Sequence, residues 1–79
     1  MKCKIKAFGV AGEILGGKEV EINISGSTVG DLKTSLFNQH PQFKNLNSLF
    51  VAVNQEYATD QSEINELDEV ALIPPVAGG

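Results

Sequence analysis

The spacing of the apolar residues changes along this chain from every second position to every third or fourth, and that change most constrains its fold. Apolar and polar residues alternate over residues 2–8 and again over residues 19–25, which predicts two strands that each bury one face. Over residues 29–37 the apolar residues instead follow the period of an amphipathic helix. The inward residues of the two strands are Cys3, Ile5, Ala7, Val20, Ile22 and Ile24.

The helix has a predicted signal at each end. Thr28 followed by Asp31 resembles a capping box, with aspartate in place of the usual glutamate, so the helix should begin there. It should end at His40-Pro41, because the residue before a proline is disfavoured in the helical conformation. Its apolar stripe consists of Val29, Leu32, Leu36 and Phe37.

The second half of the chain predicts three shorter strands, which are residues 50–53, 55–58 and 69–73. Residues 50–53 should be buried, Asn54-Gln55 should form a turn, and Ile64 with Leu67 should anchor a helical turn. The element order β-β-α-β-(short β)-β favours a mixed sheet with one main helix packed across it. In about this length, it is the pattern of the ubiquitin-like β-grasp, an α+β fold. The connections are a stretch with a helical turn at residues 13–15 and a polar loop over residues 42–49.

Length and charge exclude several classes of function. Seventy-nine residues make one domain with a modest core, which buries only about 60% of its unfolded surface and leaves little room for a deep active site. Six lysines, no arginine and ten carboxylates give a net charge of −4, the wrong sign for nucleic acid or an anionic membrane. The single cysteine excludes an internal disulfide, and no segment has the apolar length of a signal peptide or a membrane span. We therefore expect a cytoplasmic protein that binds neither nucleic acid nor membrane.

Several patterns that resemble catalytic or binding sites are rejected. Residues 12–18 have the spacing of a phosphate-binding loop, but Glu19 stands where that site needs Ser or Thr, and a strand follows instead of a helix. His40 is the only histidine, so no histidine-based metal cluster or Ser-His-Asp relay is expected. Cys3 should behave as a small buried hydrophobe, and no bound metal or cofactor is expected. A solvated face, or else a negative patch for a basic partner, is formed by Glu63, Glu66, Asp68 and Glu69.

The chain ends in Gly78-Gly79, directly after Pro74-Pro75-Val76-Ala77. Two glycines place no side chain near the last carboxylate, so a narrow tunnel could close around the backbone, and the prolines stiffen the approach. Residues 74–79 span at most roughly 20 Å when extended. We expect a β-grasp body over residues 1–73 and a flexible, extended tail over residues 74–79. The alternative is an ordinary frayed terminus.

The chemistry of such a tail would lie in its terminal carboxyl group. With a reference pKa of about 3.3–3.7 this group is ionised at pH 7 and is a poor electrophile. It must be activated before it reacts, and an acyl adenylate made from ATP is the usual route. A sulfur nucleophile would then leave a thiocarboxylate and an amine would leave an amide. The two glycines are compatible with both outcomes.

The sequence as a whole resembles the MoaD family, the small sulfur-carrying subunits of molybdopterin synthase. The likeness covers the whole chain, including Phe8 and residues 13–16. It is most specific over residues 51–57 and 67–79, the second of which closes with D-E-V-A-x-x-P-P-V-x-G-G. The resemblance implies that an ATP-dependent activating enzyme adenylates Gly79 and that a sulfur donor system converts it into a thiocarboxylate.

The same resemblance implies a partner and a substrate. The carrier would dock on the large synthase subunit, in a heterotetramer of two small and two large subunits, and give its sulfur to cyclic pyranopterin monophosphate to form the molybdopterin dithiolene. The catalytic lysines would belong to the large subunit. The tail residues inserted into that subunit's active site would be Val76, Ala77, Gly78 and Gly79. Because side chains alternate between the two faces of a strand, Phe8 and Ile73 should point away from the core. The predicted interface with the large subunit consists of Phe8, Tyr57, Ile73, Pro74 and Pro75.

Three other functions are compatible with much of the same sequence pattern. A sulfur carrier of the thiazole pathway would have the same fold, tail and activation chemistry, although the Pro-Pro-Val-Ala stretch argues against it. A ubiquitin-like protein modifier would form isopeptide bonds through Gly79, but Val76-Ala77 lacks the basic residue common before the glycines of such modifiers. In a non-reactive interaction module the tail would be incidental, and Phe8, Tyr57 and Ile73 would merely pack against loops.

Overall fold

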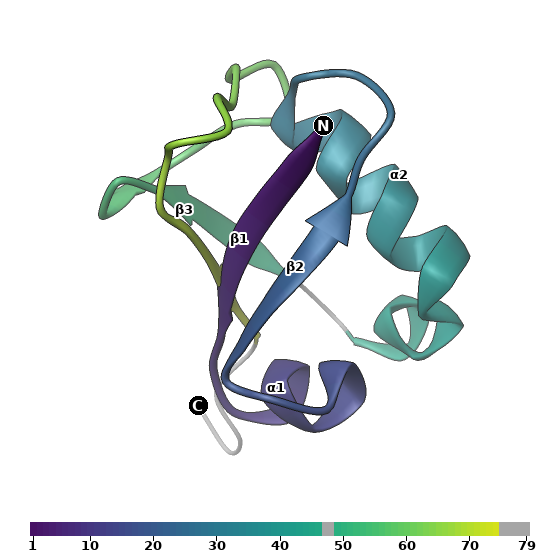
Figure 1. Cartoon of the computed structure of the whole chain (residues 1–79). Helices are drawn as coiled ribbons and strands as arrows, with labels where there is room; N and C mark the ends of the chain where they lie inside the picture. The colour runs from purple at the N-terminus through teal and green to yellow at the C-terminus, as the bar shows by residue number, and fades with distance from the viewer. Residues whose placement is uncertain (47–48, 75–79) are drawn as a thin grey trace.

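The computed structural model describes residues 1–46 and 49–74 and shows a five-stranded sheet with one long helix across one face (Figure 1). The helices are α1 (Val10–Leu15), α2 (Val29–Gln39) and the 3-10 helix η1 (Pro41–Asn45). The predicted order is confirmed, except that α1 is longer than the expected turn and η1 replaces part of the expected loop. The strands are β1 (Lys2–Ala7), β2 (Glu19–Asn23), β3 (Phe50–Val53), β4 (Glu56–Tyr57) and β5 (Val70–Ile73).

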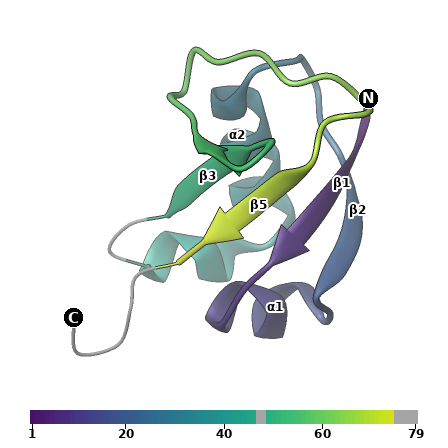
Figure 2. The same cartoon turned by 90° about the vertical axis from the view of Figure 1, so that its left-hand side faces the viewer.

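The sheet is mixed, with the strand order β2-β1-β5-β3-β4. The first and last strands, β1 and β5, lie side by side and run parallel, whereas every other pair is antiparallel (Figure 2). The α+β, β-grasp arrangement expected from the sequence is therefore confirmed. Because β1 and β5 are parallel, Phe8 after the first and Pro74 after the second emerge at the same end of the sheet. The Phe8 N–H donates a hydrogen bond to the Leu72 carbonyl at 3.3 Å.

The core lies between the sheet and α2, and the inward residues of both predicted strands line it. Burial raises the pKa of the Cys3 thiol, which fits its predicted role as a small hydrophobe. The predicted strand residue Val20 is only half-buried, near the edge of the sheet. The largest fully buried side chains are Phe43, Ile5, Leu32, Leu36, Ile64 and Leu72.

The prediction that Leu67 anchors a helical turn was wrong. Ile64 is buried as expected, but Leu67 is 99% exposed. The Asp68 carboxylate accepts a hydrogen bond from the Asn65 N–H at 2.8 Å, and the Asp68 N–H donates to the Asn65 carbonyl at 3.0 Å. These bonds close a turn whose tip is Leu67, so its side chain points away from the core.

The amino-terminal end of α2 is fixed by the predicted capping box. The Asp31 N–H donates to the Thr28 hydroxyl at 3.1 Å, and the Asp31 carboxylate accepts from the Thr28 N–H at 3.2 Å. Two further helix N–H groups, of Val29 and Gly30, donate to loop carbonyls at 2.9 Å each. The free donors at this helix end are thereby paired with acceptors from the chain itself.

Asp31→Asn should remove a pH-dependent part of the stability. Hydrogen bonds from the Thr28 and Ser27 backbone hold the pKa of Asp31 below its ordinary value. The stabilisation is therefore complete above the ordinary pKa of about 3.9 and is lost as pH falls through the lowered folded value. In thermal denaturation at a series of pH values, we expect the wild type to exceed the variant most at about pH 5–7 and the difference to shrink below about pH 4. A difference independent of pH would contradict this assignment.

Gly26→Ala should destabilise the protein through the same capping box. Gly26 has a φ of 106°, and an added methyl group would overlap the Asp31 carboxylate. Gly16→Ala is the matched control, because Gly16 also has a positive φ of 83° but has open space where a methyl group would lie. In urea denaturation we expect the free energy of unfolding to fall by about 2–3 kcal/mol for G26A and about 1 kcal/mol for G16A. Equal losses would show that the overlap with Asp31 has no effect.

Candidate functional site

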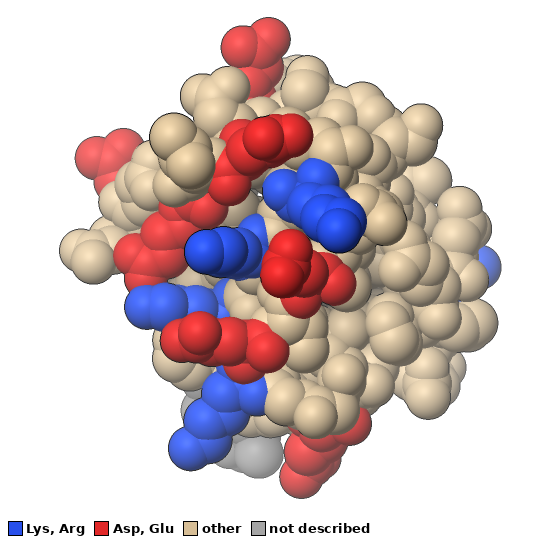
Figure 3. Space-filling model, viewed as in Figure 1, with Lys and Arg blue, Asp and Glu red and all other residues tan. Residues whose placement is uncertain are grey.

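The face of the sheet away from α2 is open, and one half of it is charged. Space-filling Figure 3 shows lysine and acidic side chains interleaved over β1 and β2. The register places Lys4 opposite Glu21 and Lys6 opposite Glu19, which are favourable cross-strand pairs. Lys6 also forms an ion pair with Glu69, and the hydrogen bond and charge of that carboxylate raise the pKa of Lys6.

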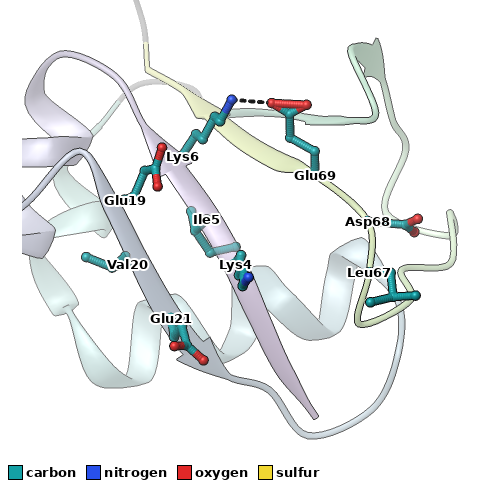
Figure 4. Close-up of a pocket in the computed structure, with 9 residues that line it drawn as sticks. All are labelled: Lys4, Ile5, Lys6, Glu19, Val20, Glu21, Leu67, Asp68 and Glu69. Atoms are coloured by element: carbon teal, nitrogen blue, oxygen red, sulfur yellow. Dashed lines mark ion pairs between the residues drawn. The ribbon is translucent and has the colours of Figure 1, made fainter.

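A hollow of about 460 Å³ lies over this charged half (Figure 4). Its polar lining residues come from β1, β2 and the segment before β5, and they are Lys4, Lys6, Glu19, Glu21, Asp68 and Glu69. Its lysines come from β1, and its carboxylates come from the flanking strand β2 and from the segment before β5, so each lysine lies beside a carboxylate and the hollow does not favour a ligand of either sign. We interpret it as a surface of exposed charges of both signs, whose one ion pair, Lys6 with Glu69, contributes little to stability.

The other half of the same face carries an apolar patch, which consists of Phe8, Phe50, Tyr57, Ala71 and Ile73. The antiparallel register places Phe50 opposite Ile73, so both side chains point to this face. Phe8, Phe50 and Tyr57 are 53%, 54% and 74% exposed, and the Phe50 and Tyr57 rings meet edge to face with centroids 5.8 Å apart. Exposed aromatic side chains that cluster in this way are typical of a surface that binds another protein.

A second hollow, of about 370 Å³, lies where the apolar patch meets the charged half, and Lys6 and Glu69 form part of its lining. Three predicted interface residues, Phe8, Tyr57 and Ile73, line it together, although they lie far apart in the sequence. The fourth, Pro74, follows β5 directly, and its ring lies beside Gly9. The structure therefore gathers these four predicted residues at one end of the sheet. The remaining predicted site residues lie outside the described residues, and they are Pro75, Val76, Ala77, Gly78 and Gly79.

Phe50 is the member of the patch that the sequence reasoning missed. It was expected to be buried with the rest of residues 50–53, and that expectation was wrong for this side chain. Val51 is buried on the α2 side, so Phe50 must face the opposite side of the sheet. The alternation of side chains along a strand, which predicts that Phe8 and Ile73 face outward, predicts the same for Phe50 once Val51 is taken as buried.

The described part of the chain contains neither a candidate metal centre nor a candidate membrane-spanning helix. Within 1–46 and 49–74, no three side chains of histidine, cysteine, aspartate or glutamate lie together in a way that could hold a metal ion. The longest described helix, α2, has eleven residues, and no helix of the described ranges has the length and apolar character needed to cross a membrane.

Comparison with known proteins places the chain in a family. The model of the ThiS family matches residues 5–79, which include the apolar patch and the whole tail. The chain belongs to the ThiS family. The molybdopterin synthase sulfur carrier subunit of Dictyostelium discoideum is similar to this ThiS-family chain, with 40% identity over 81 residues that cover 96% of this chain and 94% of that protein. The resemblance to carriers of this type inferred from the residues is thus confirmed.

Two further similar proteins have solved structures. A structure from Pyrococcus furiosus, described as a candidate molybdopterin converting factor subunit 1, has a TM-score of 0.82 and 29% identity and covers 96% of this ThiS-family chain and 99% of its own. Small archaeal modifier protein 1 from Haloferax volcanii is 31% identical over 84 residues, which cover 94% of this chain and 97% of that protein. Its crystal structure has a TM-score of 0.79 at 29% identity, with both chains fully covered.

Proposed function

We propose that this chain is the sulfur carrier subunit of a molybdopterin synthase. The observation that carries the proposal is the 40% identity, over nearly the full length of both proteins, to the Dictyostelium subunit of that name. The Gly-Gly terminus and the apolar patch beside the last strand support it, because a carrier needs a reactive end and a surface by which partners recognise it.

The reacting group is the Gly79 carboxylate. On an activating enzyme its oxygen attacks the α-phosphorus of ATP, which forms the acyl adenylate and releases pyrophosphate. Hydrosulfide supplied by a donor system then attacks the acyl carbon and displaces AMP, which leaves a thiocarboxylate. On the large subunit the thiocarboxylate sulfur attacks a carbon of cyclic pyranopterin monophosphate and displaces an oxygen there, which joins carrier and precursor as a thioester. Two charged carriers in turn supply the two sulfur atoms of the dithiolene. Hydrolysis at the acyl carbon returns the Gly79 carboxylate, and the body of this chain contributes no acid or base to these steps.

The body serves to present the tail. Because Phe8 and Pro74 emerge at the same end of the sheet, a partner that covers the apolar patch also receives the chain that follows Pro74. Residues 74–79 can then extend roughly 20 Å into that partner. Val76 and Ala77 line the tunnel, and Gly78 lets it close around the backbone. The partner is the large synthase subunit, in an assembly of two small and two large subunits.

A second candidate function is protein modification. It is favoured by the likeness to the Haloferax volcanii small archaeal modifier protein 1, in sequence and in fold. An activated Gly79 would then be attacked by a lysine amine of another protein and form an isopeptide bond. The two candidates share the activation step and differ in the nucleophile that follows it.

A reconstitution with labelled sulfide tests the proposal. The chain is incubated with the activating enzyme of its own organism, ATP, a sulfur donor and the large subunit, and cyclic pyranopterin monophosphate is then added. We expect the label to leave the carrier and appear in molybdopterin only when the large subunit is present. Molybdopterin without label, together with conjugates of higher mass on the other proteins of the mixture, would favour the modifier instead.

A further inference from the structure

The turn between β3 and β4 has an unusual backbone conformation. Asn54 and Gln55 form a two-residue hairpin connection, since Val53 pairs with Glu56, and their φ angles are 52° and 70°. Two positive φ values in a two-residue connection are those of a type I′ turn, for which Asn-Gly is the favoured sequence. Gln55 therefore occupies a position where glycine would adopt the backbone without strain.

The structure explains Asn54 by contacts within the chain. Its side-chain N–H donates to the Asp68 carboxylate at 3.0 Å, and its side-chain oxygen accepts from the Glu69 N–H at 3.0 Å. Its own N–H donates to the Glu69 carbonyl at 2.7 Å. These three bonds join the hairpin to the segment before β5, and asparagine tolerates the left-handed conformation better than most residues.

Among the residues that the structure describes, none makes a hydrogen bond that would offset the strain at Gln55. Within the described ranges its carboxamide forms no hydrogen bond, and the residue is exposed. It does line the second hollow, together with Phe8, Tyr57 and Ile73. The other polar residues of that lining, Lys6 and Glu69, pair with each other, whereas Gln55 does not pair with either. The strained residue thus holds a polar group at the rim of the surface that the large subunit is proposed to cover. Strain of this kind collects at binding and catalytic sites.

We propose that Gln55 is a specificity-determining residue of the carrier's interface, whose carboxamide pairs with a main-chain peptide group of the large subunit. This inference rests on the proposed function. A carboxamide both donates and accepts hydrogen bonds, so it matches the N–H and C=O of a peptide unit. When the partner covers the patch, water leaves the rim, and a peptide group placed there without a hydrogen bond would weaken the complex. Gln55 would thereby reject partners that are apolar throughout this region.

Three substitutions at position 55 separate this role from a structural one. Q55G removes both the carboxamide and the strain, Q55A removes only the carboxamide, and Q55N keeps a shorter carboxamide in a residue that tolerates the turn. Melting temperature is measured on the free chain, and Kd for the purified large subunit is measured by calorimetry. The matched control is Gln61→Ala, because Gln61 is also exposed but does not line the second hollow.

We expect Q55G to raise the melting temperature by about 4–8 °C and yet to weaken binding about tenfold. Q55A should weaken binding equally without the rise in melting temperature, Q55N should retain more affinity than either, and Q61A should bind as the wild type does. Unchanged affinity of Q55G and Q55A would overturn the inference, as would a fall in the melting temperature of Q55G. A wild-type chain that fails to bind the large subunit would instead overturn the proposed function, and the inference with it.

Discussion

Deletion of Gly79 is expected to abolish sulfur transfer while the body of the protein remains folded. The deletion draws the terminal carboxyl group back by one residue, about 3.3–3.6 Å along an extended chain. A misplacement of about 1 Å can already cost about 10²-fold in rate, so we expect molybdopterin formation to fall by well over 10²-fold. The rate is measured in the reconstitution with the large subunit, and folding is measured by circular dichroism.

Because β5 ends at Ile73, the deletion removes no residue of the sheet, and the melting temperature should be that of the wild type. A variant with one extra glycine after Gly79 is the matched control, since it displaces the carboxyl group by the same length in the other direction and should be equally inactive. Appreciable transfer by either variant would show that the position of the terminal carboxyl group does not matter.

Phe8→Asp should weaken binding to the large subunit by about 100-fold or more. The apolar patch would be covered in the complex, and substitution of a central aromatic residue in an interface commonly costs 2 kcal/mol or more. The new carboxylate would in addition have to lose its hydration when the partner covers the patch. At about 1.4 kcal/mol for each factor of ten, these costs give the stated change in Kd, which is measured by calorimetry.

Leu67→Asp makes the same kind of change outside the patch. Leu67 is 99% exposed, at the tip of the turn before β5, so the variant should fold normally and bind the large subunit as the wild type does. Phe8 is 53% exposed and follows the end of β1, so F8D should also fold. Equal losses of affinity in the two variants would show that net charge, and not the apolar patch, controls binding.

The sequence predicts the elements that depend on local geometry alone. Alternation of lysines with Cys3, Ile5 and Ala7 predicts β1, and Thr28 with Asp31 predicts where α2 begins, because both patterns follow from local geometry. The turn at Leu67 was predicted wrongly. The spacing of Ile64 and Leu67 suits a helical turn, whereas the hydrogen bonds between Asp68 and Asn65 close a different one.

The apolar patch could be predicted only in part. Strand parity shows that Phe8 and Ile73 face outward, but their proximity depends on a parallel pairing between β1 and β5, which lie at opposite ends of the chain. Phe50 joins the patch through its register with Ile73, which is another long-range pairing. The positive φ of Gln55 is likewise a property of the folded hairpin, since Asn54-Gln55 indicates only a turn.

The central claim is that Gly79 carries sulfur, and intact mass spectrometry tests it most directly. The chain is incubated with the activating enzyme, ATP and a sulfur donor, and its mass is compared with that of a sample without ATP. We predict an ATP-dependent species heavier by about 16 Da, one oxygen replaced by sulfur, with fragmentation that places the change at Gly79. A chain whose mass is unchanged although ATP is consumed and the adenylate forms would contradict the account.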